Sequence, residues 1–138
     1  MPSFLLVFTG VDMPHFVVEY SGNLEDKLDF QPLFKALHEY VVGTGHFPIG
    51  GVRSRAIRVD HYRVADGRED FALLNLNLKI GHGRSMEIKR EVAQNVFSIL
   101  SDWMESVTNE HYVQISFELT ELDPELKYNK NNIHPLFK

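Results

Sequence analysis

The amino-acid sequence predicts an α+β domain in which two β-α-β units form one four-stranded mixed sheet with two helices on one face. The first observation is the order of periodic segments, which runs strand-helix-strand and then strand-helix-strand. The second is that each helical segment is long enough to cross between parallel strands of one sheet. The third is a length of 138 residues without a low-complexity linker, which suits a single domain.

The first unit opens with HFVVEY at residues 15–20, whose β-branched and aromatic residues are typical of a strand. A helix is predicted over about 30–42, and Gly43 and Gly45 end it. Its apolar face repeats at helical spacing and contains Phe30, Leu33, Phe34, Leu37 and Val41. After the loop FPIGG, a second strand is predicted over about 54–64.

The second unit follows ADGRED at residues 65–70, which predicts a turn. In ALLNLNLKI, residues 72–80, leucine or isoleucine alternates with asparagine or lysine, the pattern of a half-buried strand. A helix is predicted over about 85–107, with an apolar stripe of Val92, Val96, Ile99, Leu100, Trp103 and Val107. YVQISFEL at residues 112–119 alternates again and predicts the fourth strand. The tail from residue 128 is polar and ends in an apolar segment.

Two helices on one face leave the other face of the predicted sheet without cover. Leucine or phenylalanine side chains on that face need to be buried. In a chain this short, the natural cover is another subunit, so the sequence predicts self-association.

The composition excludes several classes of function. The chain has no cysteine, which excludes disulfides, thiol catalysis and cysteine metal sites. The formal charge is −5 and Lys and Arg form no long block, so nucleic acid is not an expected partner. The apolar run FLLVF at residues 4–8 is too short for a membrane span and lacks the flanks of a signal peptide, so we expect a cytoplasmic protein. The seven histidines are scattered without metal-ligand spacing, so no metal is expected.

Four motifs are distinctive in combination: MPHFVVEYSGN, TGHFPIGGVRSR, YRVADGREDFALLNLNLKIGHGRS and SFELTELDPELKYNKNNIHPLFK. On these motifs the chain resembles the 5-carboxymethyl-2-hydroxymuconate isomerase family of the tautomerase superfamily, from Pro14 to Lys138. The second half alone also resembles one short subunit of 4-oxalocrotonate tautomerase. The resemblance implies a homotrimer of β-α-β fold, no cofactor, and a small polycarboxylate substrate in homoprotocatechuate breakdown, the route from 4-hydroxyphenylacetate.

The resemblance also implies the site residues, which are a catalytic amino-terminal proline at Pro14 and arginines at Arg53 and Arg84. The reaction moves a proton through a dienolate, so it needs a base with a pKa near the working pH and cations facing the oxyanion. A free α-amine has a pKa of about 7.7–8.0, which burial and nearby arginines lower further. Arg84 follows a Gly-x-Gly at the start of a helix, where N–H groups and the dipole favour an anion. Of Arg53 and Arg55, only one is expected to face the pocket, and Arg53 is favoured.

One feature of the sequence opposes the assignment of Pro14 as the base. Met13 precedes it, so the nitrogen of Pro14 is part of an amide, and an amide nitrogen is not a base. Either translation starts at Met13 with the methionine then removed, or residues 1–12 are a tag or start-site artefact outside an isomerase domain at 13–138, or the chain is inactive. Pro2 could also substitute, since MPSFLLVF imitates MPHFVVEY.

Two rival functions stay open at this point. One is a non-catalytic trimeric protein that binds small anions through the same arginines, and the other is a tautomerase acting on another 2-hydroxymuconate-like dienol. His15 and His82 are expected beside the site, where they would tune it. In the tail, Asn131, Asn132 and His134 are expected to pack in the trimer.

Overall fold

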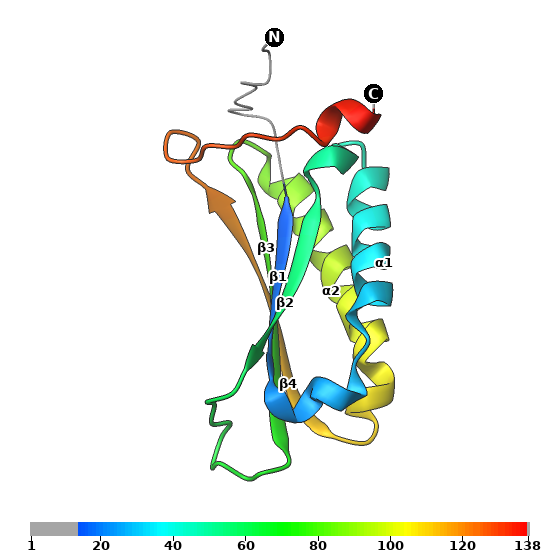
Figure 1. The fold of residues 1–138 in the computed structure, drawn as a ribbon, viewed down its shortest axis with the longest axis vertical. Coiled ribbons are helices and arrows are strands. Elements are labelled where there is room, and N and C mark those ends of the chain that lie inside the picture. The colour runs from blue at the N-terminus through cyan, green and yellow to red at the C-terminus, as the bar shows by residue number, and fades with distance from the viewer. Residues whose placement is uncertain (1–13, 138) are drawn as a thin grey trace.

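The computed structural model of the chain describes residues 14–137, so the expectations for Pro2, Met13 and the segment 1–12 lie outside the described residues. One four-stranded sheet carries both long helices on one face (Figure 1). The strands and helices are β1 (His15–Ser21), α1 (Phe30–Gly43), β2 (Arg53–Val59), β3 (Phe71–Gly81), α2 (Met86–Thr108) and β4 (Tyr112–Leu122). Short 3₁₀ helices are η1 (Gly22–Lys27), η2 (Ile49–Gly51) and η3 (His134–Phe137).

The strand order β2-β1-β3-β4 gives each predicted unit its own half of the sheet. β1 pairs with β2 in parallel, β3 pairs with β4 in parallel, and β1 meets β3 antiparallel. The two β-α-β units and their mixed sheet are therefore confirmed. Because β1 and β2 begin where β3 ends, His15, Arg53 and Gly81 meet at one end of the sheet, called the upper end here as it is drawn in Figure 1.

The second predicted strand is too long, because β2 stops at Val59 and residues 60–70 form a loop. The reason is the strand order: β1 lies between β2 and β3, so the chain must leave the sheet and pass the lower end of β1 before β3 begins. The turn in ADGRED is present, with positive φ values of 51° at Ala65 and 89° at Gly67. It joins two strands that do not pair with each other.

The core lies between the sheet and the helices, and the alternation in β3 builds it. Leu74, Leu76 and Leu78 are completely buried, opposite Tyr20, Val18 and Phe16 of β1. From α2 the buried residues are Val92, Val96, Leu100, Met104 and Val107. Met104 was not expected in this stripe, whereas the predicted Ile99 and Trp103 are only partly buried. A spacing of four residues from Val92 places Met104 in the buried stripe of α2. Trp103 lies at the margin of this stripe, with its ring centroid 5.4 Å from that of Phe30.

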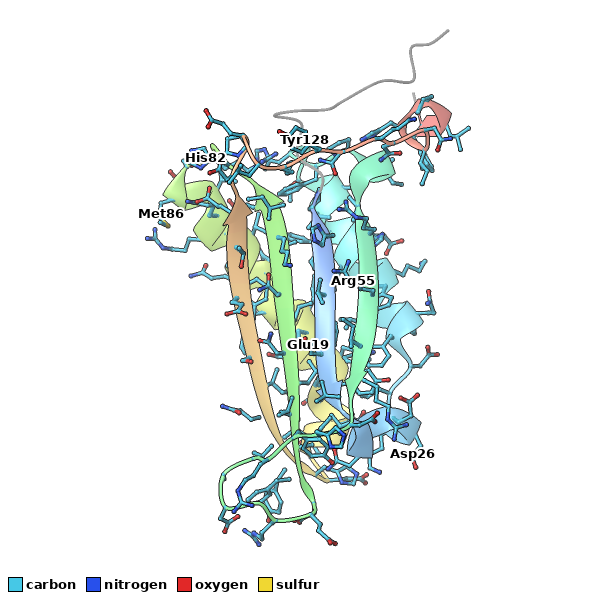
Figure 2. All side chains as sticks on the ribbon, turned by 60° about the vertical axis from the view of Figure 1, so that its left-hand side comes forward. Glu19, Asp26, Arg55, His82, Met86 and Tyr128 are labelled. Atoms are coloured by element: carbon cyan, nitrogen blue, oxygen red, sulfur yellow. The ribbon has the colours of Figure 1, made fainter. Side chains whose placement is uncertain are left out.

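The open face of the sheet, away from the helices, is mixed rather than apolar. Figure 2 shows Glu19 and Arg55 on this face. Asn75 accepts a hydrogen bond of 2.8 Å from Ser116 there, and Asn77 donates one of 3.0 Å to Glu118. The leucines of β3 alternate onto the helix side instead, so the expectation of an apolar open face is wrong over most of its length.

Ser85 begins α2 by capping it, as its side-chain oxygen accepts the N–H of Ile88 at 3.2 Å. We expect Ser85→Ala to lower the free energy of unfolding by about 0.5–2 kcal/mol, because an N–H of the first turn loses its acceptor. Ser85→Asp should keep wild-type stability, since aspartate also caps helices. Urea unfolding of both variants checks this, and an Ala variant as stable as the Asp variant would contradict it.

Candidate active site

Pro14 lies immediately before β1 at the upper end of the sheet and is buried. Its carbonyl oxygen accepts the backbone N–H of Arg53 at 3.4 Å. That hydrogen bond extends the parallel β1–β2 pairing by one step and brings the proline to the first residue of β2. Two of the three predicted site residues are thus neighbours across strands.

Arg53 is the first residue of β2 and lies level with His15. Its Nη1 donates to the carbonyl oxygen of Gly51 at 3.1 Å, so the guanidinium is folded back against the turn that precedes the strand. The pKa of Arg53 lies below its ordinary value, first because surrounding atoms desolvate the guanidinium and then because Arg55 adds a second positive charge. A carboxylate bound here would offset both effects, because its negative charge stabilises the protonated guanidinium.

Arg53 and Arg55 lie on the same face of β2, so the face of the strand does not decide which of them belongs to the site. β2 is a regular strand from Arg53 onward, and residues two apart in a strand share a face. Their positions along the strand distinguish them. Arg53 is level with His15, next to Pro14, whereas Arg55 is level with Val17, farther down the open face (Figure 2).

Arg84 lies in the connection between β3 and α2, just before the helix cap at Ser85. Its Nη2 donates to the carbonyl oxygen of His46 at 2.6 Å. The guanidinium carbon also lies 4.6 Å from the centre of the Phe47 ring, a cation–π contact. Arg84 is therefore held against the loop after α1, the same loop that leads through η2 to Arg53.

The two histidines expected beside the site differ in their surroundings. His15 is buried and level with both Arg53 and Lys79. His82 is well exposed, and its Nδ1 lies 4.0 Å from Oε2 of Glu121 on β4, the edge strand far from β2 (Figure 2). Sequence reasoning missed Lys79 as a site candidate, although its place beside Asn75 and Asn77 in the alternation puts it on the open face near the upper end.

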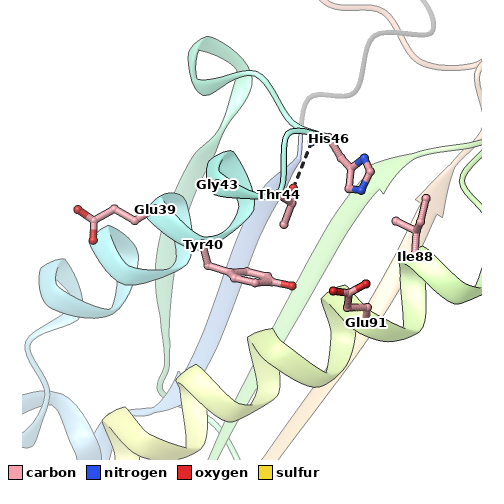
Figure 3. Close-up of a pocket in the computed structure, with 7 residues that line it drawn as sticks. All are labelled: Glu39, Tyr40, Gly43, Thr44, His46, Ile88 and Glu91. Atoms are coloured by element: carbon pink, nitrogen blue, oxygen red, sulfur yellow. Dashed lines mark hydrogen bonds between the residues drawn. The ribbon is translucent and has the colours of Figure 1, made fainter.

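A cavity of about 440 Å³ lies between α1 and α2 (Figure 3). Its lining residues are Glu39, Tyr40, Gly43, Thr44, His46, Ile88 and Glu91. At its margin the backbone N–H of His46 donates to Oγ1 of Thr44 at 3.2 Å. Among the described residues, two carboxylates and no lysine or arginine line this cavity, so it repels a polycarboxylate and does not suit the expected substrate.

Within residues 14–137 no three His, Asp or Glu side chains are grouped so that they could hold a metal ion. No helix in the same part of the chain is long and apolar enough to cross a membrane.

A protein-family model described as 5-carboxymethyl-2-hydroxymuconate isomerase matches residues 14–137. The chain belongs to this family. It is 38% identical over 126 residues to the 5-carboxymethyl-2-hydroxymuconate Delta-isomerase of Escherichia coli, a match that covers 91% of this chain and 100% of that protein. The resemblance expected from the motifs is confirmed, and the chain is an isomerase of this family.

Solved structures agree with the fold. A 5-carboxymethyl-2-hydroxymuconate isomerase from Deinococcus radiodurans R1 is 32% identical with a TM-score of 0.86, and the match covers 92% of this chain and 96% of that one. A member of the cis-3-chloroacrylic acid dehalogenase family is 18% identical with a TM-score of 0.59, over 78% of this chain and 74% of that one. The second likeness concerns the fold alone and extends it beyond the isomerase family.

Proposed function

We propose that the chain isomerises 5-carboxymethyl-2-hydroxymuconate by moving one proton, with the amine of Pro14 as base. The observation that carries this proposal is the meeting of Pro14, Arg53 and the loop that holds Arg84 at one end of the sheet. The name of the Escherichia coli relative supports this substrate. We place the reaction in the cytoplasmic breakdown of homoprotocatechuate, formed from 4-hydroxyphenylacetate.

This proton transfer requires a base and fixed cations. The free amine of Pro14 removes the proton of the dienol hydroxyl group, and the same proton is returned to a carbon of the conjugated chain, which leaves a ketone. Negative charge develops on oxygen between these two steps, and a fixed guanidinium stabilises it more than water does. We assign Arg53 and Arg84 to that charge and to the substrate carboxylates, because guanidinium groups bind carboxylates with two parallel hydrogen bonds. No cofactor enters this scheme.

The proposed base requires that residues 1–12 form an extension outside the isomerase domain at 13–138. The family match begins at Pro14, which supports this reading. Removal of Met13 would then leave a secondary amine whose direction the proline ring restricts.

We also propose that the protein works as a homotrimer. Apolar side chains that are exposed in one chain support self-association, and they include Ile57, Tyr112, Leu126, Tyr128, Leu136 and Phe137. In the apolar segment that ends the tail, Leu136 and Phe137 are 77% and 56% exposed and do not fill a core in their own chain. Multi-angle light scattering at micromolar concentration should therefore return three times the chain mass of 15.9 kDa, and a monomer would contradict the proposal.

The substrate assignment is tested by comparing dienols. We expect 5-carboxymethyl-2-hydroxymuconate to be turned over with a higher kcat/KM than 2-hydroxymuconate, which lacks the carboxymethyl group. The missing carboxylate removes a partner from the cations at the upper end of the sheet. Equal or reversed preference would favour the related alternative, a tautomerase of another 2-hydroxymuconate-like dienol.

A non-catalytic anion-binding trimer is the second candidate function. One observation favours it: in the 138-residue sequence the nitrogen of Pro14 is an amide. The intact mass of the protein made from its native gene separates the two. A mass equal to that of a chain with residues 1–12 supports the binding protein. A mass equal to that of a chain whose first residue is Pro14 supports the isomerase.

A further inference from the structure

The C-terminal tail, residues 123–137, crosses the upper end of the sheet. It leaves β4 at one edge and reaches η2, which precedes β2 at the opposite edge. The tail must therefore pass the ends of β3 and β1, and Figure 1 shows it running across the top of the sheet above the start of β1. This route brings the tail over the end of the molecule where Pro14 and Arg53 lie.

The tail is attached to η2 by two residues. The side-chain Nδ2 of Asn131 donates to the carbonyl oxygen of Gly50 at 2.8 Å. His134 is 7% exposed and packs directly on Gly50, where a Cβ atom would lie 2.6 Å from Nδ1 and 2.7 Å from Cα of His134. Only glycine permits this approach, because contacts under 3.0 Å with a backbone atom force one of the partners to move.

One peptide bond links Gly50, where the tail is attached, to the residue whose carbonyl oxygen holds the Arg53 side chain. The residue after Gly50 is Gly51, whose carbonyl oxygen accepts from Nη1 of Arg53 at 3.1 Å. The same turn is closed by hydrogen bonds of 3.1 Å from Gly51 to Pro48 and of 3.2 Å from Val52 to Ile49. A shift of the Gly50 carbonyl therefore rotates the next peptide and moves the acceptor that orients the guanidinium.

We propose that Asn131 and His134 are positioning residues, which hold η2 in place and thereby aim the Arg53 guanidinium at a carboxylate of the substrate. The inference rests on the proposed function, since it assigns a role toward the same polycarboxylate. Asn131 suits this task because its Oδ1 separately accepts the backbone N–H groups of Ile133 at 2.7 Å and His134 at 3.3 Å. One side chain thus shapes the η3 turn and fastens that turn to η2.

The two functions of Asn131 can be separated by substitution. Asn131→Asp keeps the oxygen that shapes the η3 turn but replaces the donor to Gly50 with a carboxylate oxygen, so only the attachment is lost. Asn132→Asp is the matched control, because it adds the same charge at the exposed neighbouring residue. Gly50→Ala breaks the attachment from the other side by forcing a methyl group into His134.

The first measurement is amide hydrogen exchange in the full 138-residue chain, which needs no activity. In Asn131→Asp and Gly50→Ala, the amides of Gly51, Val52 and Arg53 should exchange faster, because the turn opens more often. Those amides should exchange as in the wild type in Asn132→Asp. Unchanged exchange in both attachment variants would overturn the inference, whether or not the chain is an isomerase.

The second measurement is a double-mutant cycle on the dissociation constant of 5-carboxymethyl-2-hydroxymuconate, followed by its ultraviolet absorbance. Asn131→Asp should weaken binding by about tenfold, which is part of the value of a hydrogen bond to a charged group. In an Arg53→Ala background the same substitution should add nothing, because the tail acts through that guanidinium. A purely structural role would give additive losses and would overturn the inference. Wild-type protein that neither binds nor isomerises the compound would instead contradict the proposed function, and the exchange data alone would then decide about the tail.

Discussion

A chain that begins at Pro14 should isomerise 5-carboxymethyl-2-hydroxymuconate faster, by orders of magnitude, than the 138-residue chain that retains residues 1–12. The reason is the type of bond at nitrogen. Met13 converts the amine of Pro14 into an amide, whose lone pair is delocalised into the carbonyl group. Without that acyl group we expect the amine to titrate at a pKa below the about 7.7–8.0 of an ordinary α-amine, because burial and the nearby arginines disfavour its protonated form.

The test is expression from Met13, with intact mass showing that the methionine has been removed, followed by a rate assay of both forms. In the short form, kcat/KM should rise with pH through a single ionisation, since the neutral amine is the active state. Pro14→Ala in the short form is the control for bond type and should retain partial activity, because a primary amine remains. Equal turnover by the long and short forms, each verified by mass, would exclude Pro14 as the base and point to Pro2 or to a side chain such as His15.

The fold was predictable because each half of the chain carries a complete local pattern. Leu74, Leu76 and Leu78 alternate with polar residues, and the structure places all three beneath the helices. What the pattern could not supply was how the two units join. The pairing of β1 with β3 places β1 between β2 and β3 and turns residues 60–70 into a loop, and no spacing within that segment reveals that the units meet through β1 and β3. Non-local pairing of this kind is decided by the whole sheet.

The sequence assigns Pro14, Arg53 and Arg84 to one candidate site, and the structure brings Pro14, Arg53 and the loop that holds Arg84 to one end of the sheet. How these residues are held could not be predicted. Arg84 lies just before α2, as its motif predicts, and its guanidinium contacts the loop after α1 through the carbonyl oxygen of His46 and the ring of Phe47. The link from Asn131 to Gly50 joins residues 81 positions apart. Such contacts depend on the tertiary route of the tail, which neither periodicity nor motif spacing contains.

Arg53→Ala and Arg84→Ala, each made in the form that begins at Pro14, should lower turnover by about 10²–10³-fold, the usual cost of removing one partner of a developing oxyanion. The two arginines are held in place by different contacts. Arg53 sits beside Pro14 through the backbone hydrogen bond between them, whereas Arg84 approaches from the start of α2 and also packs on Phe47. Arg84→Ala should therefore cost slightly more stability than Arg53→Ala, and thermal unfolding of both variants measures that difference.

Arg55→Ala is the matched control for Arg53, because Arg55 lies on the same strand and the same face but level with Val17 rather than His15. It removes the same charge, so a general electrostatic effect would slow both variants alike, while a specific contact would slow Arg53→Ala far more. Arg84→Lys provides the second control. It keeps the charge but loses the planar fork that binds a carboxylate through two hydrogen bonds, so its activity should stay well below wild type. Wild-type turnover in Arg53→Ala or Arg84→Ala would show that the substrate carboxylates bind elsewhere. In that case Arg55 and Lys79, two further cations on the open face, become the residues to test.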